Sequence, residues 1–515
     1  MRQRPDSWDC GIRSPVSSVS RRLRLRKSDG SDQAASRCAG LERGCHVYCD
    51  GVEAASNLIR TAPDVRSPFR YEGWAIDPAC GLLTCRYSLG DRAFQEKVSF
   101  ASGVRWEEPE VAEAARLVFL LAGVSYYKTA APPVIDLGQT AVTDAERDFL
   151  RAFYLDGLGE YAYRNELDLS GLRIEGPAAE AAAARRPAAD WRAGDPGRPL
   201  VPFGGGIDSI VTVEMVRRRA EPALFIVSRP GDRFAAIERP AAVTGLPVVR
   251  AERGIDPQLS EDARAPEPRF LNGHVPVTGI LSAIAVMAAV LEGRDAVVMS
   301  NEWSASIATL EVDGRPINHQ YSKSAAFEAG FRTVLDGAFG GRLSYFSALR
   351  PCTELWVAQR FAALTAYHDT FHSCNRAFYI DPAKRLDYWC GNCDKCCFID
   401  LILAPFLPAA DLDRIFGGSE PLSDPAPSAA LADRFRTLLG TSPNSRPFEC
   451  VGEVGECRAA AMLAAQRPDR ADAMLLQELA RELPAQPDLP TAAQLLRPAG
   501  EHFIPDAYAA EDLLV

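Results

Sequence analysis

Leu200-Val-Pro-Phe-Gly-Gly-Gly-Ile-Asp-Ser-Ile-Val-Thr212 begins as an apolar strand, breaks into three glycines and continues as an apolar helix. Glycines let the backbone adopt positive φ and approach an anion closely, and a helix N-terminus offers unpaired N–H groups with a favourable dipole. The stretch therefore predicts a phosphate-binding turn. It is not a Walker loop, because no lysine follows the glycines. A plainer interpretation is a strand-to-helix turn with Asp208 as the helix N-cap.

The composition narrows the class of protein. A chain of 515 residues with 47% hydrophobic and 24% charged residues is typical of a multidomain globular protein. The net charge of −11 argues against a nucleic-acid partner, and no apolar run of about twenty residues predicts a membrane span. Only six of the 57 basic residues are lysines, so a lysine inside a motif suggests that arginine would not serve there.

Five regions follow from shifts in composition and periodicity. The first is expected to be disordered or a spurious extension, the second an α+β domain, and the third a linker or exposed insertion. The fourth is predicted to be the domain that holds the phosphate-binding turn and the cysteine cluster, and the fifth a helical cap. The first region is residues 1–60, the second 61–175, the third 176–198, the fourth 199–405 and the fifth 406–515.

The second region opens with alternating aromatic residues between turn signals, from residue 69 to residue 100, which predicts an antiparallel meander. Helical periodicity follows at residues 111–121 and 144–161. Between these helices, Gly123-Val-Ser-Tyr-Tyr-Lys128 either faces a ligand or packs beside a helix end. The rare lysine favours a ligand slightly.

After the glycine turn, strands and helices alternate. Buried strands are predicted at residues 223–228, 247–251 and 296–301, with a long helix at 276–291, which indicates a parallel sheet covered on both faces. Ligands bind at the carboxyl ends of such strands. The glycine turn and Ser300-Asn-Glu-Trp-Ser-Ala-Ser306 are therefore expected to share one cleft. Asn301 and Glu302 then either cap a helix or contact magnesium or substrate.

Further along, His319-Gln-Tyr-Ser-Lys323 forms a polar loop before a helix that starts near Ser324. His319 and Lys323 offer a base and a cation near the predicted cleft, although polar loops without a function are equally common.

The fourteen cysteines are not spaced like a disulfide framework, and five fall between Cys374 and Cys397. This spacing suits a reducing, cytoplasmic compartment. A CxxCxxC run with a fourth cysteine sixteen residues upstream is typical of structural zinc sites; redox or simply buried thiols are the alternatives. The predicted ligands of Zn²⁺ are Cys374, Cys390, Cys393 and Cys396. Cys397 is left over.

The glycine turn resembles the PP-loop of the ATP pyrophosphatases, SGGxDS, although Gly204 stands where that pattern has its first serine. A PP-loop followed by a CGxCxxC motif also resembles the 7-cyano-7-deazaguanine synthases. The resemblance implies that Gly204, Gly205, Gly206 and Ser209 bind the phosphates of ATP, and that Asp208 helps to bind Mg²⁺.

A second resemblance covers most of the chain from about residue 69. The chain is similar to the UDP-N-acetyl-α-D-muramoyl-L-alanyl-L-glutamate epimerases of peptidoglycan synthesis. It is carried by Gly123-Val-Ser-Tyr-Tyr-Lys, the glycine turn, the 300–306 stretch, Ser373-Cys-Asn-Arg-Ala, Trp389-Cys-Gly-Asn-Cys-Asp-Lys-Cys-Cys and Pro447-Phe-Glu-Cys-Val-Gly-Glu453. The last stretch interrupts the C-terminal helical pattern and is either a core turn or a loop over the active site.

This resemblance implies that the terminal L-Glu of UDP-MurNAc-L-Ala-L-Glu is inverted to D-Glu while ATP is cleaved to AMP and diphosphate. Adenylating the carboxylate removes a negative charge, which makes the neighbouring α-proton more acidic. The base stays open among Cys352, Cys397, His319 and Lys323. Alternatives are a PP-loop amide or nitrile synthase, a tRNA-modifying enzyme, and a zinc-stabilised nucleic-acid binder, with the net charge counting against the last two.

Overall fold

The computed structural model describes residues 67–100, 105–179, 191–265, 269–312, 314–443, 448–449, 451–483, 489–508 and 514. The predicted extension at residues 1–60 lies outside the described residues, as does the middle of the predicted linker. Across the described residues runs a ten-stranded sheet in the order β12-β9-β6-β7-β8-β3-β2-β1-β4-β5. Its strands are β1 (Phe69–Asp77), β2 (Leu82–Leu89), β3 (Arg92–Phe100), β4 (Val134–Asp136), β5 (Arg173–Glu175), β6 (Leu200–Pro202), β7 (Ala223–Ser228), β8 (Val248–Gly254), β9 (Ala296–Met299) and β12 (Ser344–Ser347).

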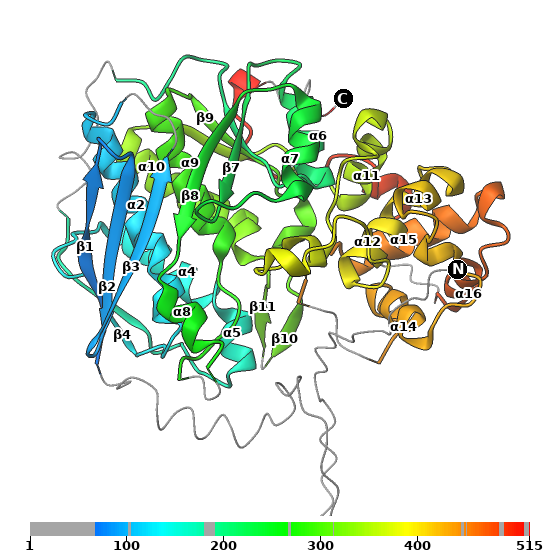
Figure 1. The fold of residues 1–515 in the computed structure, drawn as a ribbon, viewed down its shortest axis with the longest axis horizontal. Coiled ribbons are helices and arrows are strands. Elements are labelled where there is room, and N and C mark those ends of the chain that lie inside the picture. The colour runs from blue at the N-terminus through cyan, green and yellow to red at the C-terminus, as the bar shows by residue number, and fades with distance from the viewer. Residues whose placement is uncertain are drawn as a thin grey trace, which may run out of the picture. The chain divides into compact units, whose positions relative to one another are not determined.

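The first three strands form the predicted antiparallel meander, shown in blue in Figure 1. Their side chains alternate between buried and more exposed positions, because successive residues of a strand point to opposite faces. The buried face carries a stack of aromatic rings that includes Phe69, Tyr71 and Tyr87. One face of this half of the sheet therefore lies against the core.

The other half of the sheet, β8-β7-β6-β9-β12, is parallel, as the alternation of strands and helices predicts. Both of its faces are covered. In β7, Ala223 and Phe225 belong to one hydrophobic cluster, whereas Leu224 and Ile226 belong to the other. A strand buried on both faces reads as a continuous apolar run, which explains why the sequence pattern located it correctly.

The two halves are one sheet because β3 pairs antiparallel with β8, from Lys97 opposite Gly254 to Phe100 opposite Ala251. The predicted boundary between regions 61–175 and 199–405 therefore does not interrupt the hydrogen-bonded ladder. Pairing an edge strand of the meander with an edge strand of the parallel half satisfies two rows of backbone groups that would otherwise stay unpaired.

Two hydrophobic cores flank the sheet. The first contains α2, α4, α9 and α10, and the second contains α6, α7, α11, α12 and the helices that follow. The described helices are α2 (Pro109–Ala122), α3 (Val124–Tyr127), α4 (Asp144–Leu155), α5 (Gly159–Arg164), α6 (Ile207–Val216), α7 (Ala235–Thr244), α8 (Pro257–Asp262), α9 (Val277–Glu292), α10 (Ala325–Phe339), α11 (Glu354–Ala362), α12 (Asp394–Leu403), α13 (Ala409–Ile415), α14 (Ala429–Leu438), α15 (Val454–Ala465), α16 (Met474–Glu482) and α17 (Ala492–Leu495).

The region after residue 406 is helical, as its periodicity predicts, and α15 packs against both α11 and α12. A short hairpin of β10 (Leu310–Val312) and β11 (Arg315–Ile317) forms a separate sheet. Within the described residues, no helix is both long enough and apolar enough to cross a bilayer.

Candidate active site

The glycine turn lies between β6 and α6, at the carboxyl end of a central parallel strand. Gly205 adopts a φ of 77°, and a Cβ built there would stand 2.3 Å from the carbonyl oxygen of Ala236, so only glycine fits. Gly204 has open space around it and is exposed. The helix N-cap is Gly206 rather than Asp208, which corrects the plainer interpretation of the motif. The turn therefore presents open backbone at a helix N-terminus.

Three carboxylates gather beside this turn, and we call them the carboxylate cluster. They are Asp208 on α6, Glu302 after β9 and Glu354 at the start of α11, and one oxygen of each lies within 4.8 Å of the others. Asp208 is half-buried, whereas Glu302 and Glu354 are buried. The predicted meeting of the glycine turn and the 300–306 stretch at one sheet edge is thus seen in the structure. Hard divalent cations such as Mg²⁺ favour oxygen ligands of this kind.

Burial and the repulsion between neighbouring carboxylates raise pKa values in the carboxylate cluster. Burial, followed by the charge of Glu302, raises the pKa of Asp208 to about 6. Burial and then the charge of Asp208 raise the pKa of Glu354 well above its ordinary value. Among the described residues, Asp208 Oδ1 and Glu354 Oε2 are buried without a hydrogen-bond partner. Buried acceptors are almost always satisfied, so these two atoms suit a cation.

Two of the six lysines face the carboxylates. The charges of Lys395 and Lys323 both act to lower the pKa of Asp208, and Lys395 acts on Glu354 in the same direction. Lys323 ends the short 3-10 helix η3 (Tyr321–Lys323), and Lys395 lies in the first turn of α12. Lys323 was among the candidates selected from the sequence, as a cation near the predicted cleft. Lys395, which sits inside the cysteine motif, was not selected from the sequence.

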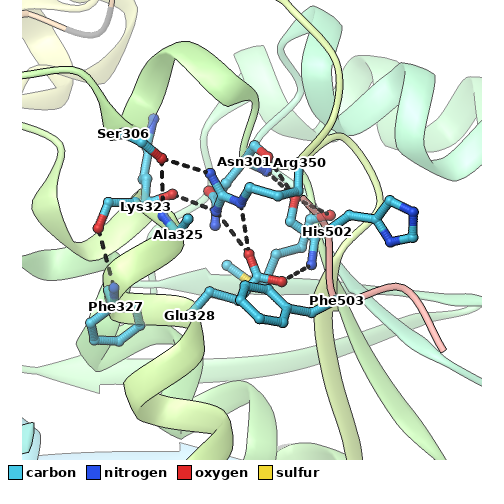
Figure 2. Close-up of polar contacts among 12 residues, drawn as sticks. Asn301, Ser306, Lys323, Ala325, Phe327, Glu328, Arg350, His502 and Phe503 are labelled. Carbon is cyan, nitrogen blue, oxygen red and sulfur yellow. Dashed lines mark hydrogen bonds and ion pairs between the residues drawn. The ribbon is translucent and has the colours of Figure 1, made fainter. Parts of the chain in front are cut away.

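A buried arginine braces the segments that carry Glu302 and Lys323. Arg350 is 2% exposed and pairs with Glu328, with 2.9 Å between Nε and Oε2. The same guanidinium donates to the carbonyl oxygens of Glu302 and Lys323 at 2.9 and 2.7 Å. Figure 2 shows this fork, with Arg350 between Glu328 and Lys323. Five fixed donors make arginine suited to tying several loops together.

Neighbouring backbone contacts hold Asn301 and Glu354. Ser347 at the end of β12 accepts a hydrogen bond from the Asn301 N–H at 2.7 Å and donates to its carbonyl. Glu456 on α15 accepts the N–H of Glu354 at 2.9 Å. Glu302 precedes the 3-10 helix η2 (Trp303–Ser306), but its side chain makes no capping bond. Glu302 therefore occupies the N-cap position through its backbone, while its carboxylate lies in the carboxylate cluster.

A small cavity includes Ser304, which lies two residues after Glu302 in the sequence. Its wall includes Ser304 and Gln320, together with Glu449 and Glu453 from the C-terminal loop. Within the described part of the chain, Ser304 Oγ and Gln320 Oε1 are buried without a hydrogen-bond partner. The described part of the 447–453 stretch thus lines a polar cavity.

A second polar group lies near this cavity, and we call it the histidine cluster. Its members are Glu160 on α5, His274 before α9 and His319 before η3, with donor atoms within 4.8 Å of one another. Lys128 donates to Asn272 Oδ1 and to the Gly273 carbonyl beside His274, and burial lowers its pKa to about 8. In contrast, Tyr126 and Tyr127 are fully buried packing residues. Within this motif Lys128 lies beside His274, whereas Ser125 accepts a hydrogen bond from the buried Arg253, which pairs with Glu96.

The four predicted zinc ligands come together as a third group, the thiol cluster: Cys374, Cys390, Cys393 and Cys396. The Sγ atoms of Cys374 and Cys393 are 4.0 Å apart, and those of Cys390 and Cys396 are 3.7 Å apart. Four sulfurs about 2.3 Å from a tetrahedral ion would be separated by about 3.8 Å. The donor set therefore fits a structural Zn²⁺ ion with no open position.

The thiols proposed as bases are poorly suited to that role. Cys352 and Cys397 are both fully buried, and burial raises the pKa of each above the ordinary thiol value. A buried apolar thiol is inert, because the thiolate is the reactive form. The geometry thus favours His319 and Lys323 among the four candidates.

Sequence reasoning missed Glu160, His274, Glu354, Lys395 and Arg350. No spacing rule links these residues to the glycine turn, because tertiary folding alone brings their segments together. The only available signal was the rarity of lysine, which applies to Lys395.

The described fold is that of a mixed α/β protein with a polar site at the carboxyl ends of parallel strands. Two family models match the chain: the MurL N-terminal domain over residues 60–348 and the MurL C-terminal domain over residues 370–494. Together they cover the sheet, the carboxylate cluster except Glu354, and the thiol cluster.

Curated relatives carry one name, UDP-N-acetyl-alpha-D-muramoyl-L-alanyl-L-glutamate epimerase. The protein from Xanthomonas oryzae pv. oryzae is 38% identical over 451 residues, which is 86% of this chain and 96% of that protein. The protein from Salinispora tropica is 39% identical over 456 residues, covering 86% and 94% of the two chains. This chain therefore belongs to the MurL family of epimerases, and it is an isomerase.

Proposed function

We propose that this chain inverts the terminal L-Glu of UDP-MurNAc-L-Ala-L-Glu to D-Glu during synthesis of peptidoglycan precursors. The names of the relatives support this substrate, and the match extends over 86% of the chain. We further propose that inversion consumes ATP and releases AMP and diphosphate. Since ATP and UDP-linked precursors are cytoplasmic compounds, we expect the enzyme to act in the cytoplasm.

The weak acidity of the α-proton of glutamate explains why the proposed reaction needs ATP. The α-proton beside a carboxylate is very weakly acidic, because removing it places a second negative charge next to the first. Transfer of AMP to the carboxylate removes that charge and makes an enolate accessible. Reprotonation from the other face and hydrolysis of the acyl adenylate complete the inversion.

The carboxylate cluster beside the glycine turn is the observation that carries this proposal. Exposed backbone at Gly204 and the N-terminus of α6 suit a phosphate group. Asp208, Glu302 and Glu354 would hold Mg²⁺, as their unpartnered oxygens and raised pKa values suggest. When bound, magnesium neutralises phosphate charge during adenylation. Lys323 and Lys395 bring positive charge close to Asp208 of the carboxylate cluster.

The thiol cluster has a different role in the proposal. All four of its positions are protein thiols, so a zinc ion there would leave no site for substrate. The cluster fixes the start of α12, because Cys393 is the N-cap of that helix and its Sγ accepts the N–H of Cys396. Lys395 lies within this turn. Zinc would therefore act on catalysis only by fixing the position of Lys395.

The test uses the purified full chain with ATP, Mg²⁺ and the UDP-muramoyl dipeptide. We expect AMP, diphosphate and D-Glu to form in equal amounts, and omission of any one reactant to stop all three. D-Glu formed without ATP would overturn the adenylation step. AMP formed without D-Glu would favour a synthase that uses the same ATP chemistry.

A further inference from the structure

The histidine cluster is assembled from three separate segments: helix α5, the loop before α9 and the loop before η3. Glu160 is 5% exposed, and both histidines are half-buried. The rings of His274 and His319 are in contact, with their centroids 4.2 Å apart and their planes tilted by 41°. His319 Nδ1 and Glu160 Oε2 are 2.5 Å apart. The cluster thus holds one imidazole by a carboxylate on one side and a second ring on another.

The short distance between Glu160 and His319 distinguishes a hydrogen bond from a shared metal. Two ligands on one tetrahedral zinc ion stand about 3.3 Å apart, because each lies about 2.0–2.1 Å from the metal. The separation of 2.5 Å between His319 Nδ1 and Glu160 Oε2 is that of a hydrogen bond. Burial acts to raise the pKa of Glu160, but the hydrogen bond and charge of His319 outweigh it, and the pKa is lowered. Glu160 is therefore a charged acceptor that orients the ring of His319.

The position of His319 relative to the cavity supports a role with substrate. Gln320, the next residue, lines the cavity, and so does Glu449, whose pKa is affected by the charge of His319. Ser304, two residues after Glu302, lines the same cavity. Within the described residues, Ser304 Oγ and Gln320 Oε1 are buried without partners, as expected for groups that bind polar atoms of a ligand. The cavity is therefore lined both by the residue next to His319 and by a residue of the segment that follows Glu302.

We propose that His319, oriented by Glu160, exchanges the α-proton of the adenylated glutamyl residue. This inference rests on the proposed function. The Cα–H bond breaks, an N–H bond forms at His319 Nε2, and the electron pair enters the activated carboxyl group as an enolate. A second acid delivers a proton to the opposite face, and both groups then re-equilibrate with water. His319 is the catalytic residue, and Glu160 is a positioning residue.

Several charged groups set the protonation of this pair. Arg164 pairs with Glu160 at 2.6 Å, and Glu449 faces His319 from the C-terminal loop. Burial and then the charge of His319 lower the pKa of His274 to about 4, and Lys128 acts in the same direction. His274 is therefore neutral at pH 7. A neutral neighbouring ring supports the orientation of His319 without competing for the proton.

The first experiment separates adenylation from proton transfer. In His319→Gln, we expect AMP formation within about threefold of wild type, while D-Glu formation and deuterium uptake at Cα in D₂O fall at least 10³-fold. His502→Gln, which changes an exposed histidine outside the cluster, is the matched control and should keep both activities. Normal deuterium uptake in a folded His319→Gln protein would overturn the proposal, as would equal loss of AMP and D-Glu formation.

The second experiment tests the positioning role. Glu160→Gln removes the anion that stabilises protonated His319, so the acid limb of the epimerisation rate should move to lower pH and the maximal rate should fall about 10- to 100-fold. A purely structural role would lower the rate without moving the pH profile, and that result would overturn the role of Glu160. Metal analysis covers the competing reading, since a metal lost in both variants but retained by His502→Gln would replace the proton-transfer assignment. If wild type forms neither AMP nor D-Glu, the proposed function itself fails.

Discussion

The thiol cluster and the carboxylate cluster both bring metal-ligand side chains together. They differ in how far apart their members lie in the sequence and in whether the side chains repel one another. Three of the four thiols come from the eight-residue run 390–397, and short loops hold them at the start of α12. The carboxylates come from positions 208, 302 and 354, each at the end of a different strand or the start of a helix. The distances between the thiol sulfurs match those around a tetrahedral zinc ion. The carboxylates are instead buried together, and their negative charges repel one another.

The difference shows that one cluster is suited to stabilising the fold, whereas the other is suited to activity at a cost in stability. A closed thiol site contributes folding free energy when it binds metal. A group of buried like charges costs stability, and such a cost persists where activity needs it. The histidine cluster belongs with the carboxylates in this respect, because burial holds His274 neutral. The following changes test the comparison.

Cys393→Ser should have the largest effect. We expect soluble yield to collapse and bound zinc to fall from one ion per chain to a small fraction, because structural zinc supplies on the order of 10 kcal/mol in small domains. Metal content and thermal denaturation measure the change. Cys80→Ser, at an exposed cysteine outside the cluster, should behave as wild type. Metal-free protein that melts at an unchanged temperature would refute a structural metal.

Asp208→Asn should abolish activity and leave the fold intact. We expect AMP formation to fall by about 10²–10³-fold or more, since one electrostatic group at the reaction centre is lost. The melting temperature should stay level or rise, because repulsion with Glu302 and Glu354 is relieved. Glu214→Gln, on the same helix α6, is the control. Folded Asp208→Asn protein that cleaves ATP normally would contradict the role of the cluster.

Arg350→Met should affect both properties. Removing this guanidinium leaves Glu328 buried and unpaired, which costs about 3–5 kcal/mol of unfolding free energy. The double variant Glu328→Gln with Arg350→Met should recover part of that stability. We expect its turnover to stay about tenfold low, because the carbonyls of Glu302 and Lys323 have lost their shared donor. Full recovery of turnover in the double variant would show that Arg350 only neutralises Glu328.

The smallest effect concerns His274. Its pKa is lowered from 6.5 to about 4, so the unfolded chain binds the proton more tightly. The unfolding free energy of wild type should therefore fall as the pH is lowered from 6.5 to 4, by on the order of 1–3 kcal/mol relative to His274→Gln. Denaturant unfolding at several pH values measures this. Parallel curves for the two proteins would mean that the environment of His274 does not disfavour its charge.

Much of the fold followed from local pattern. The meander, the buried strand at 223–228 and helix α9 are strongly periodic and were placed from sequence, whereas the strand predicted at 296–301 ends at Met299. The thiol cluster was also predicted in full, because its ligands are close in the chain and their spacing reflects one turn and one helix start. The pairing of β3 with β8 was not predicted, since backbone hydrogen bonds between distant strands leave no signal in the side-chain pattern.

The sequence by itself therefore determined the elements, the glycine turn at Gly205 and the four thiols, because each depends on residues within a few turns of one another. Tertiary structure alone decided that Glu354 completes the carboxylate cluster, that Lys395 faces it, and that Glu160 holds His319. Those contacts join segments more than a hundred residues apart in several cases, and their geometry depends on the packing of the sheet. Tertiary burial likewise set the protonation of His274 and the inert state of Cys397. The sequence gives the type of each side chain. The burial and the neighbouring charges that set its pKa arise only when the chain folds.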